Sequence, residues 1–241
     1  MLNNKLVNNK DNNVAIVLAA GNSSRMLDQD KIFISILGKP LLYYSLKVFE
    51  ESPIIDSIVL VMSQKNIHLT KALVKEYQFK KVQVICLGGS SRFQSVKNGL
   101  SYIDEAQWVF VHDAARPCIS QELLDKLVNM AQKYGSAIPG RPVFDTLKSV
   151  NNLFKITSTV DRNLLWAAQT PQVFRFNVIS DAYRKTEIEG TDDSAIVEQF
   201  YSVNIVSVSS LNLKITVAED IPIIESVLKS MIEVDKETDI N

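Results

Sequence analysis

A loop of small residues followed by two cations is the first segment that could do chemistry. It contains Ala19, Ala20 and Gly21, and Arg25 and Lys31 follow it. Small side chains let backbone N–H groups approach phosphate oxygens closely, and the two cations would add fixed positive charge. The loop matches neither the GxxxxGK[ST] nor the GxGxxG pattern. The sequence therefore favours a triphosphate-binding loop of another kind over a plain strand-to-helix turn with solvated basic side chains.

A pair of glycines, Gly88 and Gly89, opens the second candidate segment. Paired glycines allow a ligand to contact the main chain closely, which suits recognition of a base edge. Ser90 follows directly, and Ser95 could hydrogen-bond a ribose or a base from the first turn of a helix. The alternative is a glycine turn whose serines cap that helix. These residues alone do not decide between the two interpretations.

Asp113 directly follows an apolar run that ends at His112. A carboxylate there could hold a ribose hydroxyl or Mg²⁺-bound water, since Mg²⁺ commonly uses one or two carboxylates together with substrate phosphates. The alternative is a structural ion pair between Asp113 and Arg116. The lone His112 is expected to lie in the core with its polar atoms satisfied.

Further polar residues are widely separated in the sequence. Thr146, Lys148 and Arg162 lie in or beside β-rich runs, and Lys214 lies near the end of the chain. Each alone would be a routine exposed residue. Together they could bind the phosphate group of a second, acceptor substrate.

Short apolar strands alternate with amphipathic helices from residue 14 onward. This alternation predicts an α/β fold, with a mostly parallel, doubly wound sheet and helices on both faces. Ligands of such sheets bind beyond the carboxyl ends of the strands, where the first three candidate segments fall. Strands are expected at 14–18, 58–62, 83–86, 108–112 and 203–208, and helices at 40–50, 66–77, from the glycine pair to 102, and at 120–134, 178–185, 193–200 and 218–233.

The alternation breaks between residues 136 and 162. Residues 139–142 read Pro-Gly-Arg-Pro and are expected to turn, while β-rich runs on either side of Asn151 and Asn152 predict a hairpin. We therefore expect a β-arm over 139–162, which must pack on something because an isolated hairpin is barely stable. One domain is expected over 14–235, between a disordered polar tail over 1–13 and a short tail over 236–241.

The composition argues against several classes of protein. A formal net charge of -1 over 241 residues does not suit a dedicated nucleic-acid binder. Cys86 and Cys118 belong to no CxxC or Cys/His cluster, so they are expected as buried thiols. No apolar run approaches the ~20 residues that span a bilayer. We expect a cytoplasmic protein with neither a nucleic acid nor a membrane as partner.

In combination, these segments resemble the 2-C-methyl-D-erythritol 4-phosphate cytidylyltransferase family. The resemblance implies a Rossmann-like nucleotidyltransferase fold that transfers CMP from CTP to 2-C-methyl-D-erythritol 4-phosphate. The products would be pyrophosphate and 4-diphosphocytidyl-2-C-methyl-D-erythritol, a step of the non-mevalonate route to isoprenoid precursors. It also implies Mg²⁺ or another divalent cation, and a homodimer formed through the arm. The resembling stretches, in the family's order, are 19–31, 88–99, 111–117, 145–148, 160–174, 191–193, 212–216 and 219–220.

The resemblance also implies a role for each candidate residue. Arg25, Lys31 and Lys214 correspond to cations that stabilise charge on the reacting phosphates. Thr146 and Arg162 correspond to arm residues that hold the methylerythritol phosphate bound to the partner subunit, a phosphate that Lys214 would also contact. The nucleotide contacts correspond to Ala19, Ala20, Gly21, Gly89, Ser90, Ser95, Asp113 and Ala114, with Asp113 also near the metal.

Three positions depart from the family's usual pattern. Ser23 replaces a glycine, Asp30 a proline, and Ser90 an aspartate that is common there. The additional carboxylate of Asp30 could weaken the positive potential around Lys31. Two alternatives stay open: a cytidylyltransferase for another polyol phosphate such as ribitol 5-phosphate, and a non-catalytic nucleotide-binding protein.

Overall fold

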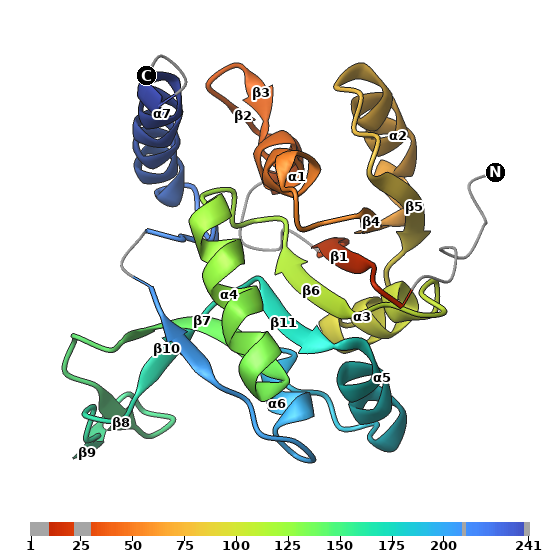
Figure 1. Cartoon of the computed structure of the whole chain (residues 1–241). Helices are drawn as coiled ribbons and strands as arrows, with labels where there is room; N and C mark the ends of the chain where they lie inside the picture. Colours follow the sequence, from red (N-terminus) through yellow and green to blue (C-terminus); the bar gives the residue numbers. More distant parts are fainter. Residues whose placement is uncertain (1–9, 22–29, 209–210, 239–241) are drawn as a thin grey trace.

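The computed structural model of this protein describes residues 10–21, 30–208 and 211–238. Figure 1 shows a central sheet whose strands follow the order β10-β7-β11-β6-β1-β4-β5, with β12 paired to β7. The eight strands are β1 (Asn13–Ala19), β4 (Ser57–Met62), β5 (Val82–Leu87), β6 (Trp108–Asp113), β7 (Ser136–Pro142), β10 (Trp166–Ala168), β11 (Gln172–Arg175) and β12 (Ile205–Ser207).

Strands β6, β1, β4 and β5 run parallel to one another. β1 lies between β4 and β6, and its residues from Val14 to Val17 are at most 1% exposed. A near-continuous apolar run is what a strand covered on both faces requires. The other half of the sheet is mixed, because β11 runs antiparallel to both β6 and β7. The predicted α/β class with a mostly parallel sheet is confirmed.

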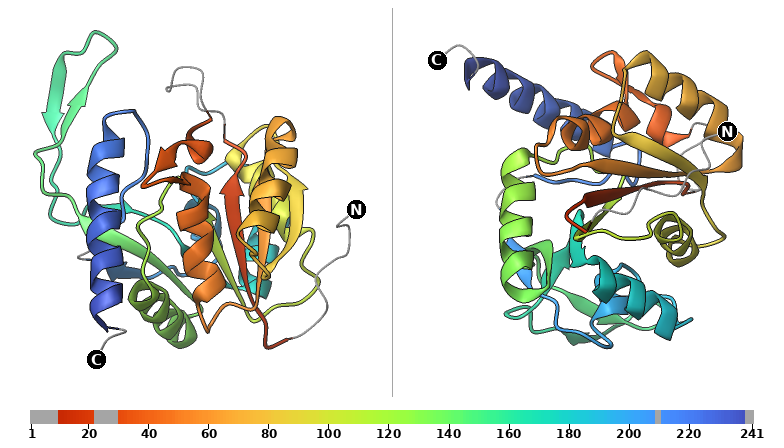
Figure 2. Two further views of the ribbon diagram at one scale, coloured as in Figure 1. Left: turned by 90° about the horizontal axis from the view of Figure 1, so that it is seen from above. Right: turned by 45° about the vertical axis from the view of Figure 1, so that its right-hand side comes forward.

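Helices cover both faces of the sheet (Figure 2). One face packs against α1 (Leu41–Glu51), α2 (Ile67–Glu76) and α4 (Gln121–Tyr134). The opposite face packs against α3 (Arg92–Leu100), α5 (Phe176–Lys185) and the short α6 (Ser194–Val197). Two 3-10 turns, η1 (Lys31–Phe33) and η2 (Gln64–Asn66), precede β2 (Ser35–Ile36) and α2 respectively. Every helix among the described residues is too short or too polar to cross a membrane.

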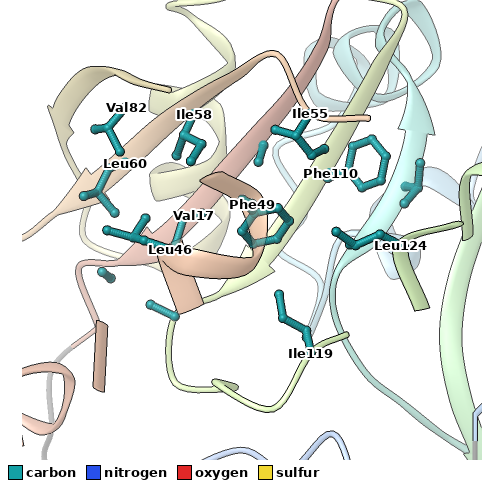
Figure 3. Close-up of a cluster of buried hydrophobic side chains, with 14 of the residues drawn as sticks. Val17, Leu46, Phe49, Ile55, Ile58, Leu60, Val82, Phe110, Ile119 and Leu124 are labelled. Atoms are coloured by element: carbon teal, nitrogen blue, oxygen red, sulfur yellow. The ribbon is translucent and has the colours of Figure 1, made fainter. Parts of the chain in front are cut away.

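The larger core cluster packs α1 against the parallel strands. Figure 3 shows Leu46 and Phe49 of α1 directed toward Val17 and Phe110, and all four side chains are fully buried. Burial of each such side chain contributes roughly 1.5–3 kcal/mol to stability. β1 and β6 pair directly along their length up to Leu18 and Asp113, so their ends, beyond which the site lies, keep a fixed separation.

The last helix, α7 (Asp220–Thr238), packs outside α1 rather than on the sheet (Figure 1). Ile224 and Leu228 of α7 join Leu41 and Tyr44 in a third buried cluster. Ile215, just before the helix, is fully buried, and its N–H donates to the carbonyl of Ala115 at 2.9 Å. This anchor holds the segment around residue 214 beside the end of β6.

The arm is a separate antiparallel hairpin of β8 (Lys148–Val150) and β9 (Ile156–Thr159) that projects from the body (Figures 1 and 2). Asn151 closes its turn, because its side-chain oxygen accepts from the N–H groups of Leu153 and Lys155, each at 3.0 Å. The predicted hairpin around residues 151–152 is confirmed. Two shorter strands, β2 (Ser35–Ile36) and β3 (Lys39–Pro40), lie next to α1.

The prediction that residues 139–142 form a turn is wrong. They belong to β7, which pairs with β10, β11 and β12. Pro139 lacks an N–H but still contributes its carbonyl, which accepts from the N–H of Gln169 at 2.8 Å. At Gly140 a Cβ would lie 3.2 Å from Ile205, so the glycine lets β12 approach closely. The arm thus begins beyond Pro142.

Smaller differences occur at the ends of other elements. The expected tails overlap with structure, since β1 begins at Asn13 and α7 runs to Thr238. The helix expected at 193–200 is only the single turn of α6, and β10 and β11 were not predicted. Residues 1–9 of the expected tail lie outside the described residues.

Candidate active site

A cavity of about 350 Å³ opens beyond the carboxyl ends of β1, β5 and β6. This is where open α/β sheets bind ligands, and the volume suits a nucleotide-sized molecule. We call it the nucleotide cavity. Its walls are Leu18, Ala19, Ala20, Gly21, Lys31, Ile32, Gly89, Ser90, Ser91, Arg92, Ser95, Asp113, Ala115 and Lys214.

A second cavity of about 240 Å³ adjoins the first, and we call it the acceptor cavity. Arg92, Asp113 and Lys214 line both cavities and form the wall between them. Two ligands bound side by side would therefore meet at these three charged side chains. The remaining walls of the acceptor cavity are Arg116, Ala168, Gln169, Thr170, Gln172, Thr191 and Asp192.

The shared wall is a chain of ion pairs. Arg92 Nε lies 3.2 Å from Asp113 Oδ1, and Lys214 Nζ lies 2.7 Å from Asp113 Oδ2. Burial alone would raise the pKa of Asp113, but the two cations outweigh it and hold that pKa well below its usual range. Arg92 also reaches Asp193, with Nη2 2.6 Å from Oδ2. The carboxylate of Asp113 thus stays ionised and keeps both cations at the junction of the cavities.

His112 fixes the loop that carries Asp113. Its Nδ1 lies 3.0 Å from the Thr170 hydroxyl, and its Nε2 lies 3.0 Å from the carbonyl of Arg116. A carbonyl can only accept, so Nε2 carries the proton and Nδ1 accepts from Thr170. Thr170 in turn accepts from the N–H of Asp113 at 3.1 Å. His112 is fully buried, which confirms that it lies in the core. Burial lowers its pKa to about 3 and so keeps the ring neutral.

Lys31 reaches the nucleotide cavity from η1. Its ammonium donates to the carbonyl of Ile215 at 3.4 Å, next to Lys214 in the sequence. The neighbouring Asp30 does not line either cavity. It pairs instead with Lys65 at 3.0 Å and accepts from the Asn66 amide. The additional carboxylate is therefore compensated by a cation outside the site.

The glycine pair brings two loops together. A Cβ on Gly88 would lie 2.3 Å from the Cβ of Ala20, so only glycine allows this approach. The Ser95 hydroxyl accepts from the N–H of Gly89 at 3.1 Å and donates to the carbonyl of Ser91 at 2.8 Å. Ser91 caps α3 by accepting from the N–H of Gln94 at 3.2 Å. The segment combines the two interpretations, because it caps a helix and also lines the nucleotide cavity.

Comparison with known proteins agrees with this geometry. A family model described as 2-C-methyl-D-erythritol 4-phosphate cytidylyltransferase matches residues 13–230. A relative of that name from Dehalococcoides mccartyi (strain CBDB1) is 44% identical over 216 residues, which cover 89% of this chain and 95% of the relative. The chain belongs to the 2-C-methyl-D-erythritol 4-phosphate cytidylyltransferase family.

Other relatives of this cytidylyltransferase family agree in sequence and in fold. One from Alkaliphilus metalliredigens is 41% identical over 220 residues, covering 88% of this chain and 91% of the relative. The crystal structure of 4-diphosphocytidyl-2C-methyl-D-erythritol synthase from Anaerococcus prevotii superposes with a TM-score of 0.78 and 28% identity, covering 91% of this chain and 97% of the other. The Francisella tularensis cytidylyltransferase gives a TM-score of 0.76 and 29% identity, with coverages of 90% and 100%.

Most site residues predicted for the cytidylyltransferase fold lie around the nucleotide cavity. They are Ala19, Ala20, Gly21, Lys31, Gly89, Ser90, Ser95, Asp113 and Lys214. Ala114 is fully buried and does not line the cavity, whereas the next residue, Ala115, does. Arg25 and Ser23 lie outside the described residues.

The two arm residues do not join either cavity of their own chain. Thr146 and Arg162 are exposed, and the Arg162 guanidinium donates to the carbonyl of Phe144. The alternative ion pair between Asp113 and Arg116 is not the one formed, since Arg116 Nη1 donates to the carbonyl of Asn212 at 2.8 Å. Arg116 is instead a wall of the acceptor cavity.

Sequence reasoning missed Arg92 and Asp193. Arg92 follows the glycine pair within the second candidate segment, so a cation at the first position of a helix was the available signal. Asp193 lies in the stretch 191–193, which carried the resemblance without a role. Its contact with Arg92 spans 101 residues and has no local signature.

The metal expected for the family would need oxygen donors on the wall of the nucleotide cavity. Among the described residues, no group of three or more His, Cys, Asp or Glu side chains could hold a metal ion. Within the described ranges, Asp113 is the one carboxylate that lines the nucleotide cavity, and its Oδ2 pairs with the partly exposed ammonium of Lys214. One carboxylate together with substrate phosphates fits Mg²⁺, which seldom needs an all-protein cage.

Proposed function

We infer that the chain transfers CMP from CTP to 2-C-methyl-D-erythritol 4-phosphate, and releases pyrophosphate and 4-diphosphocytidyl-2-C-methyl-D-erythritol. The family supports this reaction over the length of the domain. The observation that carries it is the shared wall of Arg92, Asp113 and Lys214, which separates a nucleotide-sized cavity from a smaller, cation-lined one. Two phosphate-bearing substrates that must react with each other require such a junction.

The reaction is an in-line displacement at the α-phosphorus of CTP. A phosphate oxygen of the acceptor forms the new bond to that phosphorus, and the bond to the bridging oxygen of the β-phosphate breaks. Pyrophosphate leaves with the electron pair. The acceptor phosphate is already deprotonated near neutral pH, so the step needs no general base. The chief barrier is repulsion between two anions together with charge developing in the transition state.

Cations that line the nucleotide cavity lower this barrier. Lys31 contacts the triphosphate from η1, and Lys214 contacts the α-phosphate or the acceptor phosphate from the shared wall. Arg25 adds charge from the loop after β1. Fixed cations in a site that excludes water are worth more than the same charges in bulk solvent. The reach of Lys31 and Lys214 into one cavity supports these roles.

The nucleotide lies along the loops after β1 and β5. Backbone N–H groups of Ala19, Ala20 and Gly21 approach the phosphates, and Gly89, Ser90 and Ser95 contact the cytosine and its ribose. The close packing of Gly88 on Ala20, which makes one continuous surface of the two loops, supports this assignment. Ala114 contributes through the main chain behind Asp113.

Asp113 would hold Mg²⁺ delivered with the triphosphate. Such an ion supplies additional charge neutralisation at the phosphate oxygens when bound. Asp113 itself orients Arg92 and Lys214, and remains ionised because of them. Its two functions are compatible, because a carboxylate has about four lone-pair sites.

A second copy of the chain is the partner of the arm. Leu153, Phe154 and Leu164 are 85%, 88% and 90% exposed, more apolar surface than a solvated arm requires. In a homodimer, Thr146 and Arg162 of one arm reach the acceptor cavity of the partner. The absence of both residues from their own chain's described cavities supports this arrangement.

The activity is tested by measuring CTP-dependent release of pyrophosphate with a panel of acceptors. We expect rapid turnover with 2-C-methyl-D-erythritol 4-phosphate. Turnover with ribitol 5-phosphate or erythritol 4-phosphate should be far slower. A preference for another polyol phosphate would reassign the acceptor. Binding of CTP without release for any acceptor would favour a non-catalytic nucleotide-binding protein.

A further inference from the structure

Arg92 is held at two points, and only one of them belongs to the shared wall. Its Nε lies 3.2 Å from Asp113, while its Nη2 lies 2.6 Å from Asp193 Oδ2. Asp193 is completely buried and lines neither cavity. Removing a carboxylate from water is costly unless it is well paired. Its position therefore calls for a role.

Asp193 is itself rigidly attached to the sheet and the helices. Its Oδ1 accepts from the Tyr183 hydroxyl of α5 at 2.7 Å. The adjacent Ser194 N–H donates to the Gln172 side chain of β11 at 2.8 Å, and that side chain also donates to Asp192 at 2.7 Å. A carboxylate fixed in this way can define the orientation of a long side chain that otherwise samples many rotamers.

Tyr183 connects this anchor back to the helix that carries Arg92. Its ring stacks on Phe93, the next residue of α3, with centroids 4.9 Å apart and an interplanar angle of 14°. Burial raises the pKa of Tyr183, so its hydroxyl stays protonated and donates to Asp193. The contacts close a ring from Arg92 through Asp193 and Tyr183 to Phe93.

We propose that Asp193 is a positioning residue for the reaction, acting through Arg92, with the Tyr183 hydroxyl fixing the carboxylate. With Nε and Nη2 bound, the guanidinium plane is set, and Nη1 has no protein partner among the described residues. Arg92 lines both cavities, so its remaining N–H groups face phosphate groups at the junction. This inference rests on the proposed function and adds Arg92 to the residues that contact substrate.

The test compares Asp193→Asn and Tyr183→Phe with the wild type. Asp193→Asn removes the charge but keeps the shape, and is expected to lower kcat roughly 10- to 100-fold, the scale of a lost hydrogen bond to a charged group. Tyr183→Phe keeps the ring stacking and is expected to lower kcat by roughly 2- to 10-fold. The KM for CTP should change much less than kcat, with kcat counted per CTP-binding site so that unfolded protein does not contribute.

The chain offers a matched control that involves the same helix. Tyr201, beyond α6, donates to Asp181 of α5, and this part-buried tyrosine–aspartate hydrogen bond touches neither cavity. Tyr201→Phe should leave kcat and KM at wild-type values. Equal losses in Tyr201→Phe and Tyr183→Phe would assign the effect to general packing of α5 and overturn the inference.

A double variant separates positioning from structural support. If Asp193 acts through Arg92, then Asp193→Asn should have little further effect on kcat in an Arg92→Gln background. Independent losses in the two variants would overturn the inference. If the Asp193 variants fail to fold, the Tyr183→Phe variant alone tests the inference. Wild-type turnover by Tyr183→Phe would then refute the positioning role of Asp193. A wild type without pyrophosphate release would remove the proposed function as well, whereas an active wild type with normal variants removes only this inference.

Discussion

The ammonium of Lys214 lies 2.7 Å from Asp113 Oδ2, although 101 residues separate the two in the sequence. The ion pair joins the segment before α7 to the end of β6 at the wall between the cavities. Lys214 thus neutralises Asp113 and lines both cavities. Without Lys214, Arg92 would be the one ion-pair partner left to Asp113 among the described residues.

Replacement of Lys214 should therefore impair both binding and turnover. Lys214→Met keeps the aliphatic stem, and kcat/KM is expected to fall roughly 100-fold, as for the loss of one electrostatic donor. Steady-state kinetics with each substrate varied in turn would measure it. Lys229→Met, an exposed lysine on α7, is the matched control and should behave as the wild type. A loss of similar size in both variants would contradict the role given to Lys214.

Lys31 should affect the chemical step more than nucleotide binding. We expect Lys31→Met, and likewise Arg25→Ala, to lower kcat roughly 100-fold or more, because fixed cations are most valuable when charge develops in the transition state. Single-turnover measurements at saturating CTP would isolate that step. Lys126→Met, at an exposed ion pair on α4, serves as the control. Near-normal turnover in the Lys31 and Arg25 variants would remove them from the mechanism.

The sequence predicted the parallel half of the fold well, because β1, β4 and β6 are near-continuous apolar runs with helices between them. It failed at β7, where two prolines and Gly140 are typical of a turn and only the neighbours β10, β11 and β12 make a strand of them. The local sequence pattern does not reveal pairing between strands that are far apart in the sequence.

The candidate site shows the same division. The loop after β1 and the glycine pair have local signatures, so most of the residues that line the nucleotide cavity were predicted. The partners of Arg92 were not, because Asp113 and Asp193 reach it from 21 and 101 residues away. Asp30 could not be judged from the sequence either, since its compensation by Lys65 depends on η2 folding back beside it.

His112 should make the stability of the fold depend on pH. Burial lowers its pKa to about 3 from an ordinary value of 6.5, so the unfolded chain takes up this proton first as the pH falls. The contribution is complete above pH 6.5 and is lost progressively toward pH 3, at up to about 1.4 kcal/mol per pH unit.

Denaturant unfolding at several pH values would measure this slope, and His112→Gln should flatten it. Imidazole NMR signals offer a direct check, with the exposed His68 as an internal reference in the same spectra. Titration of the His112 ring near pH 6.5 in the folded protein would contradict the buried, neutral state.

The proposed role of the arm can be tested by mixing two inactive variants. If Arg162 serves the acceptor cavity of the partner subunit, Arg162→Ala and Lys31→Met damage different halves of one composite site. Both homodimers should be nearly inactive, yet random exchange of subunits would restore one intact site in each heterodimer. Mixing equal amounts should then recover about a quarter of wild-type activity, because about half of the dimers are mixed and each has one working site of two.

The control for this mixture combines two substitutions that both damage the nucleotide cavity rather than the arm. Lys31→Met and Lys214→Met both lie in the nucleotide cavity of one chain, so no heterodimer contains an undamaged site and no activity should return. Sedimentation would establish that the variants remain dimeric, and Phe154→Asp should shift them toward monomers by burying a charge in the arm's apolar surface. Equal recovery in both mixtures, or activity in a monomeric variant, would show that each site is complete within one chain, and Arg162 would then lose its place in the reaction.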